Sequence, residues 1–134
     1  MSLLSSEFTL SFTQRDKDNA YRFIFDDVLA YIAEHSDSVT LSQLSDAFGY
    51  NPDYFSRLFN KHVGESYTHF LANTRLMRSA GYLISTKLSV EHIAVTVGFS
   101  NLGFFYRLFK EKYGMTPKEY RLVQAGGGRM PTSN

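Results

Sequence analysis

Two arginines, Arg57 and Arg107, stand at matching places in a segment that the chain contains twice. Each directly follows another side chain that can form hydrogen bonds, Ser56 in the first copy and Tyr106 in the second. A guanidinium carries a rigid fork of N–H donors, which fits paired acceptors such as O6 and N7 at the edge of guanine. The chain therefore carries two similar sets of groups that are able to read a nucleic-acid base.

The repeated segment covers residues 49–59 and 98–109, with the sequences GYNPDYFSRLF and GFSNLGFFYRLF. The offset between the copies is 49 residues at the first glycine and 50 after the turn. A short amphipathic stretch precedes each copy, at residues 41–48 and 90–97. A helix, a glycine turn and a second helix form a helix-turn-helix, which places its second helix in a DNA groove. The sequence therefore predicts two such units.

Capping residues and apolar periodicity predict about seven helices. We expect them at about Asn19 to His35, Thr40 to Phe48, Asn51 to Val63, Ser66 to Ser85, Ser89 to Val97, after Gly98 up to Gly114, and from Thr116 through Tyr120. The predicted fold class is all-α, with two helix-turn-helix subdomains (40–64 and 89–114) joined by a long central helix (66–85). At a rise of about 1.5 Å per residue this helix is about 30 Å long, close to the ~34 Å between successive major grooves. Alternatively, the helix merely completes a core.

The same periodicity predicts which side chains are buried. The expected inner residues of the first helix are Ile24, Val28, Tyr31 and Ile32. Those of the third and sixth helices are Phe55, Leu58, Phe59, Phe105, Leu108 and Phe109. Those of the connecting helix are Tyr67, Phe70, Leu71, Leu76, Leu83 and Ile84.

Charge is unevenly distributed along the chain, although the net charge is only +1. Residues 1–53 hold nine acids and three bases, whereas residues 54–134 hold four acids and eleven bases. This polarity favours one face directed toward phosphates and another directed away from them, although chance unevenness is an alternative.

The chain lacks the usual signs of an enzyme or of a metal site. It has no Cys, no nucleophile elbow and no phosphate-binding Gly-rich loop, and its four histidines are scattered. We therefore expect no enzymatic activity, no cofactor and no metal. No apolar run reaches the ~20 residues of a membrane span and no leader opens the chain, so a cytoplasmic protein without membrane contact is expected.

The two ends are expected to be peripheral. Residues 1–18 are predicted to be a remnant of a preceding domain or a linker, because Phe8, Leu10 and Phe12 alternate as in a strand without a partner. A disordered lead-in is the alternative. Residues 124–134 contain three consecutive glycines and are predicted to be a flexible tail.

The second copy resembles the signature of the AraC/XylS-type transcription regulators. The residues that carry the resemblance are Ile93-Ala94, Gly98-Phe99, Phe105, Arg107, Phe109-Lys110, Gly114, Thr116-Pro117 and Tyr120-Arg121. It covers about residues 25–123 and implies seven helices, binding to double-stranded promoter DNA, and often contact with RNA polymerase. Most members also have a sensing or dimerisation domain, commonly N-terminal, so this sequence is expected to be either a small stand-alone member or a DNA-binding fragment, and residues Phe8–Phe12 favour the fragment. Leu102, Gly103 and Phe104 depart from the family, which usually has polar residues there, and Ser79 replaces the usual Ala.

Helical geometry and the resemblance select the same candidates for base contact. They are Asp53, Ser56, Arg57, Asn60, Leu102, Gly103, Tyr106 and Arg107. Leu102 is included because it suits a thymine methyl group, and packing is its alternative role. For Asp53 a favourable charge at a helix N-terminus is the preferred role, because a carboxylate is repelled by nearby phosphates. For Asn51 and Asn101, at the starts of the same helices, capping is the preferred role.

A second set of residues is expected to contact phosphates, supplying affinity and salt dependence. The candidates are Thr40, Lys61, Lys87, Ser89, Lys110, Lys112, Lys118 and Arg121. Thr40 and Ser89 belong to this set because backbone amides at helix starts bind anions.

One other function agrees with the same helices. An all-helical module could bind a protein partner through its acidic N-terminal half without binding DNA. In the DNA-binding interpretation, that acidic half is instead expected to face away from DNA and to meet RNA polymerase or a sensor domain. Salt-sensitive binding to duplex DNA discriminates the two.

Overall fold

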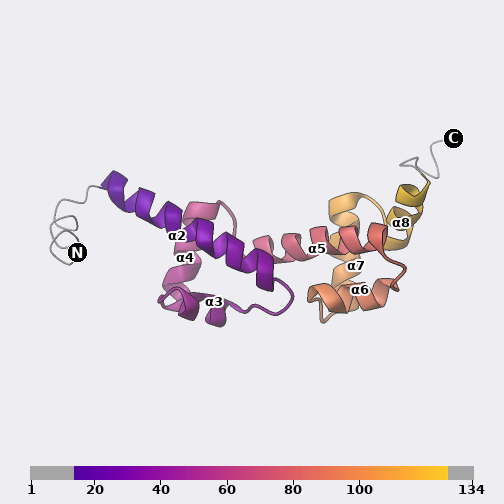
Figure 1. The fold of residues 1–134 in the computed structure, drawn as a ribbon, viewed down its shortest axis with the longest axis horizontal. Coiled ribbons are helices and arrows are strands. Elements are labelled where there is room, and N and C mark those ends of the chain that lie inside the picture. Colours follow the sequence, from indigo (N-terminus) through magenta and orange to yellow (C-terminus); the bar gives the residue numbers. More distant parts are fainter. Residues whose placement is uncertain (1–13, 127–134) are drawn as a thin grey trace. The chain divides into compact units, whose positions relative to one another are not determined.

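The structure is a computed structural model that describes the backbone of residues 14–126 and the side chains of residues 24–126. This range consists of seven α-helices and contains no strand (Figure 1). They are α2 (Gln14–His35), α3 (Leu41–Ala47), α4 (Pro52–Val63), α5 (Tyr67–Ser85), α6 (Val90–Val97), α7 (Leu102–Tyr113) and α8 (Pro117–Ala125). The predicted all-α class is confirmed. Among the described residues, no helix has the length and apolarity needed to cross a membrane.

The described residues divide into two compact units. The first comprises residues 14–34 and 40–67, and so holds most of α2 together with α3 and α4. The second comprises residues 35–39 and 68–126, and so holds most of α5 together with α6, α7 and α8. The loop between α2 and α3 therefore belongs to the second unit, although the helices on both sides of it belong to the first.

Side-chain caps set the starts of the short helices. Thr40 begins α3 with a capping box, in which its hydroxyl accepts the Gln43 amide at 3.1 Å and the Gln43 side chain accepts the Thr40 amide. The Ser89 hydroxyl accepts the His92 amide at 3.0 Å and caps α6. Both caps match the sequence-based expectation. A second capping box, between Thr116 and Glu119, opens α8.

The turns inside the two repeats depend on glycine. Gly49 (φ +76°) and Gly98 (φ +112°) adopt left-handed backbone conformations that strain other residues. Each turns the chain between the two helices of a helix-turn-helix, α3 and α4 in the first unit, α6 and α7 in the second. The predicted glycine turns are therefore present.

Phenylalanines fill both cores. In the first unit Phe25, Phe55 and Phe59 are buried, and their ring centroids lie 5.6 to 6.3 Å apart. In the second unit Phe105 and Phe109 are fully buried in a cluster with side chains from α5 and α6. Each unit thus buries one face of its second repeat helix, α4 or α7, and leaves the other face available.

Three expectations about the elements need correction. Helix α2 begins at Gln14 rather than about Asn19, because residues 14–18 contain neither Gly nor Pro and extend the helix. The residue missed on its inner face is Phe25, which packs on α4. Ile84 is 55% exposed, because it lies about 100° around α5 from the buried Leu83.

The predicted ends lie partly outside the described residues. Residues 14–18, assigned to the N-terminal remnant, are helical, and residues 124–125 of the predicted tail complete α8. Phe8, Leu10 and Phe12 and residues 127–134 fall outside the described range.

Candidate nucleic-acid interface

Helix α4 separates its residues into a buried and an outer face. Phe55, Leu58 and Phe59 are buried, as predicted. Asp53, Arg57, Asn60 and Lys61 are exposed and Ser56 is half-buried, so the structure places all five on or beside the outer face. Asn51 Oδ1 accepts hydrogen bonds from the backbone amides of Asp53 (2.9 Å) and Tyr54 (3.3 Å), which confirms that Asn51 caps the helix. Asp53 follows in the first turn, where a negative charge is favourable.

Helix α7 repeats this arrangement. Phe105 and Phe109 are buried, while Leu108 is only half-buried. Leu102, Gly103, Arg107 and Lys110 are exposed, and the last three lie on the side away from the buried rings. The Asn101 side chain accepts the Phe104 amide at 2.9 Å, so it caps α7 as predicted. The two arginines thus lie at the same position on two helices that are buried in the same way.

Tyr106 is held by a residue that the sequence did not single out. Its hydroxyl donates to Glu91 Oε2 in the first turn of α6 at 3.3 Å. Burial, and secondarily the charge of Glu91 and this hydrogen bond, raise the pKa of Tyr106 above its usual value. The phenol therefore stays protonated at neutral pH and remains a donor. The two residues are 15 positions apart, so no helical spacing could reveal the pair.

The candidate phosphate contacts fall into three groups. Lys61, Lys87, Lys110, Lys112 and Lys118 are exposed. Thr40 and Ser89 are also exposed and stand at the N-termini of α3 and α6, although the Thr40 amide already donates to Gln43. Arg121 differs, because its Nε donates to the Leu83 carbonyl at 3.0 Å and its Nη2 to the Thr86 carbonyl at 3.1 Å. Two of its donors therefore hold the end of α5 and the residues after it.

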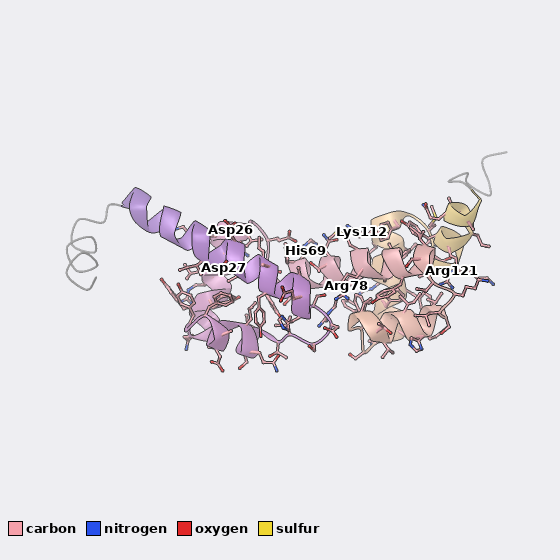
Figure 2. All side chains as sticks on the ribbon, viewed as in Figure 1. Asp26, Asp27, His69, Arg78, Lys112 and Arg121 are labelled. Atoms are coloured by element: carbon pink, nitrogen blue, oxygen red, sulfur yellow. The ribbon has the colours of Figure 1, made fainter. Side chains whose placement is uncertain are left out.

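Two further arginines of the basic half have internal partners. Arg75 Nε donates to the Ser36 carbonyl at 2.6 Å, and Arg78 Nη1 donates to the Ser36 hydroxyl at 2.8 Å. Both lie on α5, and Ser36 is fully buried in the loop that follows α2 (Figure 2 labels Arg78). Part of the positive charge counted in the sequence therefore stabilises this loop.

The acidic residues singled out on the first helix are exposed. Asp26 and Asp27 are adjacent on α2, and Figure 2 labels both. Glu34, two turns further along the same helix, is exposed as well. A solvated acidic face on α2 agrees with the polarity of the chain.

Comparison with known proteins identifies a helix-turn-helix family over this part of the chain. The family model described as "Helix-turn-helix domain" matches residues 44–122. The Xylose operon regulatory protein of Escherichia coli (strain K12) is 34% identical over 96 residues, which are 71% of this chain and 24% of that protein. The regulatory protein PocR of Salmonella typhimurium is 32% identical over 94 residues, covering 69% of this chain and 31% of PocR. The chain thus spans about a quarter to a third of these relatives.

Solved structures agree with the match to a helix-turn-helix domain. The C-terminal domain of AraT, a response regulator from Geobacillus stearothermophilus, has a TM-score of 0.67 and 30% identity, covering 81% of this chain and 87% of that one. The DNA-binding domain of AdpA, solved with a target DNA, has a TM-score of 0.70 and 21% identity over 76% of this chain and 93% of that one, and therefore supports the fold. This chain belongs to the AraC/XylS-type family of helix-turn-helix transcription regulators.

Proposed function

We propose that this chain is a sequence-specific DNA-binding transcription regulator that inserts α4 and α7 into adjacent major grooves of promoter DNA. The observation that carries the proposal is the matched exposure of Arg57 and Arg107 on helices whose opposite faces are buried. Helix α5, which follows the first helix-turn-helix and precedes the second in the chain, has 19 residues and so is about 28 Å long.

The proposal assigns different work to the two sets of exposed residues. Arg57 and Arg107 would bind guanine edges, and Ser56, Asn60 and Tyr106 would add single hydrogen bonds. The exposed lysines and the N-termini of α3 and α6 would contact phosphates, which supply affinity without sequence preference. Arg121 fits this second role less well than the lysines, because two of its donors are engaged inside the second unit.

Two further partners belong to the proposal. The relatives are three to four times longer than the matched region, which supports a sensing or dimerisation domain as a working partner. The exposed acidic face of α2 is a candidate surface for RNA polymerase or for that domain. Charge reversal at Asp26 and Asp27 should then change transcription without changing the affinity for DNA.

The experiment that tests the proposal is a gel shift of this chain on random duplex DNA at two salt concentrations, followed by selection from a random duplex library. A DNA-binding protein must bind less tightly as salt rises, because phosphate contacts release counterions. Two preferred blocks about one helical turn apart would support reading by both helices. A chain that shifts no duplex even at low salt would instead favour the protein-interaction module.

Arg57→Ala is expected to relax the preference at one base pair by about 1–3 kcal/mol, because it removes a bidentate contact to guanine. Selection and competition binding with the variant measure this directly. Arg107→Ala is the matched control and should relax a different base pair. Uniform weakening on every sequence would show that Arg57 contacts only phosphate.

Lys110→Ala is expected to weaken binding to all sequences alike. The side chain is exposed in the last turn of α7, and each phosphate contact contributes about 0.9 to the slope of log K against log salt. The slope should therefore become shallower by about that amount, while Lys110→Arg keeps it. An unchanged slope would remove Lys110 from the phosphate contacts.

A further inference from the structure

Each of the two arginines lies against an aromatic ring one helical turn earlier. Arg57 Cζ is 5.8 Å from the centroid of the Tyr54 ring, and Arg107 Cζ is 5.2 Å from that of Phe104. Residues three apart are neighbours on a helix surface, and a guanidinium within ~6 Å of a ring centroid is attracted to its π face. The same contact therefore forms independently in both units.

These rings are themselves supported from the core by a second aromatic contact. Tyr50 lies 6.0 Å from Tyr54 in the first unit, and Phe99 lies 6.4 Å from Phe104 in the second. Tyr50 and Phe99 each follow the left-handed glycine of the turn.

The series begins at a fully buried phenylalanine in both units. Tyr50 is 5.9 Å from Phe55, and Phe99 is 5.1 Å from Phe105. Each unit thus contains a continuous row of side chains that runs from a buried phenylalanine to a turn aromatic, an exposed aromatic and an arginine.

From this repeated row we infer that Tyr54 and Phe104 are positioning residues, which hold the guanidinium groups of Arg57 and Arg107 ready for base contact. The inference deepens the proposed function and rests on it. Core packing alone does not account for these two rings, because Tyr54 is 39% and Phe104 is 40% exposed. The two rings occupy equivalent positions in the two copies of the repeat, as Tyr in the first copy and as Phe in the second.

The physical effect is a reduced entropy loss on binding. A free arginine side chain loses rotamer freedom when it forms a bidentate contact, and holding it in place beforehand lowers that loss. A cation–π contact at an exposed site is weak, so the advantage should amount to about two- to fivefold in binding. It should appear as selectivity at the base pair that the arginine reads, because the ring carries no charge for phosphates.

The test compares Tyr54→Leu with Tyr54→Phe in this chain. Tyr54→Leu should lower discrimination about two- to fivefold at the base pair that Arg57→Ala relaxes, with an unchanged salt slope, whereas Tyr54→Phe keeps the ring and should retain discrimination. Phe104→Leu and Phe104→Tyr form the same pair for Arg107. Unfolding midpoints of all variants should stay close to that of the original chain, because Tyr54 and Phe104 lie at the surface, about 40% exposed, and each substitute is also largely apolar.

A double-mutant cycle separates positioning from direct contact with DNA. In the Arg57→Ala background, Tyr54→Leu should have little further effect if the ring acts through the arginine. An equal effect with and without Arg57 would mean that the ring touches DNA itself, and it would overturn the inference while leaving the proposed function intact. Unchanged base-pair discrimination in the Tyr54→Leu variant would likewise overturn the inference and leave the proposed function intact.

A measurement on the free protein, without DNA, distinguishes a failure of the positioning inference from a failure of the proposed function. The Nε–H resonance of Arg57 should be shifted by the ring current of Tyr54 in the free protein and should move toward its random-coil position in Tyr54→Leu. A resonance that does not move overturns the positioning of the arginine. Loss of salt-sensitive DNA binding in the original chain overturns the proposed function instead, together with the inference that rests on it.

Discussion

Phe105→Ala should lower the free energy of unfolding by about 3–5 kcal/mol. The ring is fully buried, and its centroid lies 5.1 Å from that of Phe99 and 5.8 Å from that of Phe109. Removing it withdraws apolar surface from the core and leaves a cavity that the surrounding helices fill only in part. Urea unfolding followed by circular dichroism measures the difference.

The next residue toward the N-terminus supplies the control. Phe104→Ala removes the same number of atoms, but this ring is 40% exposed, so we expect a cost below about 1 kcal/mol. On DNA we expect Phe104→Ala to lower the discrimination at the base pair that Arg107 reads, because the Phe104 ring is inferred to position Arg107. Equal losses of stability would contradict the placement of Phe105 at the centre of the second core.

Gly98→Ala is the second substitution with a large expected effect. Its backbone has φ +112°, and an added Cβ would lie 2.6 Å from Arg75 Nε and 2.7 Å from the Asp37 carbonyl oxygen. The arginine is held by its hydrogen bond to the Ser36 carbonyl, and a carbonyl oxygen cannot rotate away, so the backbone must shift. We expect about 1–2 kcal/mol from the left-handed conformation and a further 1–3 kcal/mol from overpacking.

Gly49→Ala isolates the conformational part of this cost. Gly49 occupies the same place in the first unit with φ +76°, and an added Cβ there meets nothing within 4 Å. Its substitution should therefore cost only about 1–2 kcal/mol. Thermal unfolding of both variants measures the difference, and a Gly49 variant as unstable as the Gly98 variant would refute the close approach at Gly98.

Local signals in the sequence were sufficient for much of the fold. Thr40, Asn51 and Ser89 act as caps because a short polar side chain satisfies amides two or three residues ahead, which depends on nearby residues alone. Gly49 and Gly98 mark their turns for a similarly local reason. The buried phenylalanines, four residues apart in each helix, then indicated which face of α4 and α7 is turned outward.

The missed features depend on contacts between distant residues. Phe25 is buried because α4 supplies Phe55 and Phe59 against it, and the periodicity of α2 favoured its neighbour Ile24 equally well. Arg75 and Arg78 look like surface cations in the sequence, yet both bind Ser36, about 40 residues away. Local patterns contain no information about such partners.

In the candidate site, too, some features follow from local sequence patterns and others depend on contacts between distant residues. The exposure of Arg57 and Arg107 followed from helical geometry, because their neighbours Phe55, Leu58, Phe105 and Phe109 had to face inward. The hydrogen bond from Tyr106 to Glu91 required the fold to bring α6 and α7 together. Contact of any of these residues with bases or phosphates stays a prediction, because it depends on a partner outside the chain.

The loop of residues 35–39 restricts how this polypeptide can be dissected. It packs within the second unit, while the residues before and after it in the chain belong to the first. A fragment that ends at Tyr67 contains Ser36 but lacks its hydrogen-bond donors Arg75 and Arg78. A fragment that starts at Thr68 contains both arginines but lacks Ser36, which accepts their hydrogen bonds. No single cut of the backbone therefore yields both halves intact, so expression of either half alone should give a less stable product than the whole.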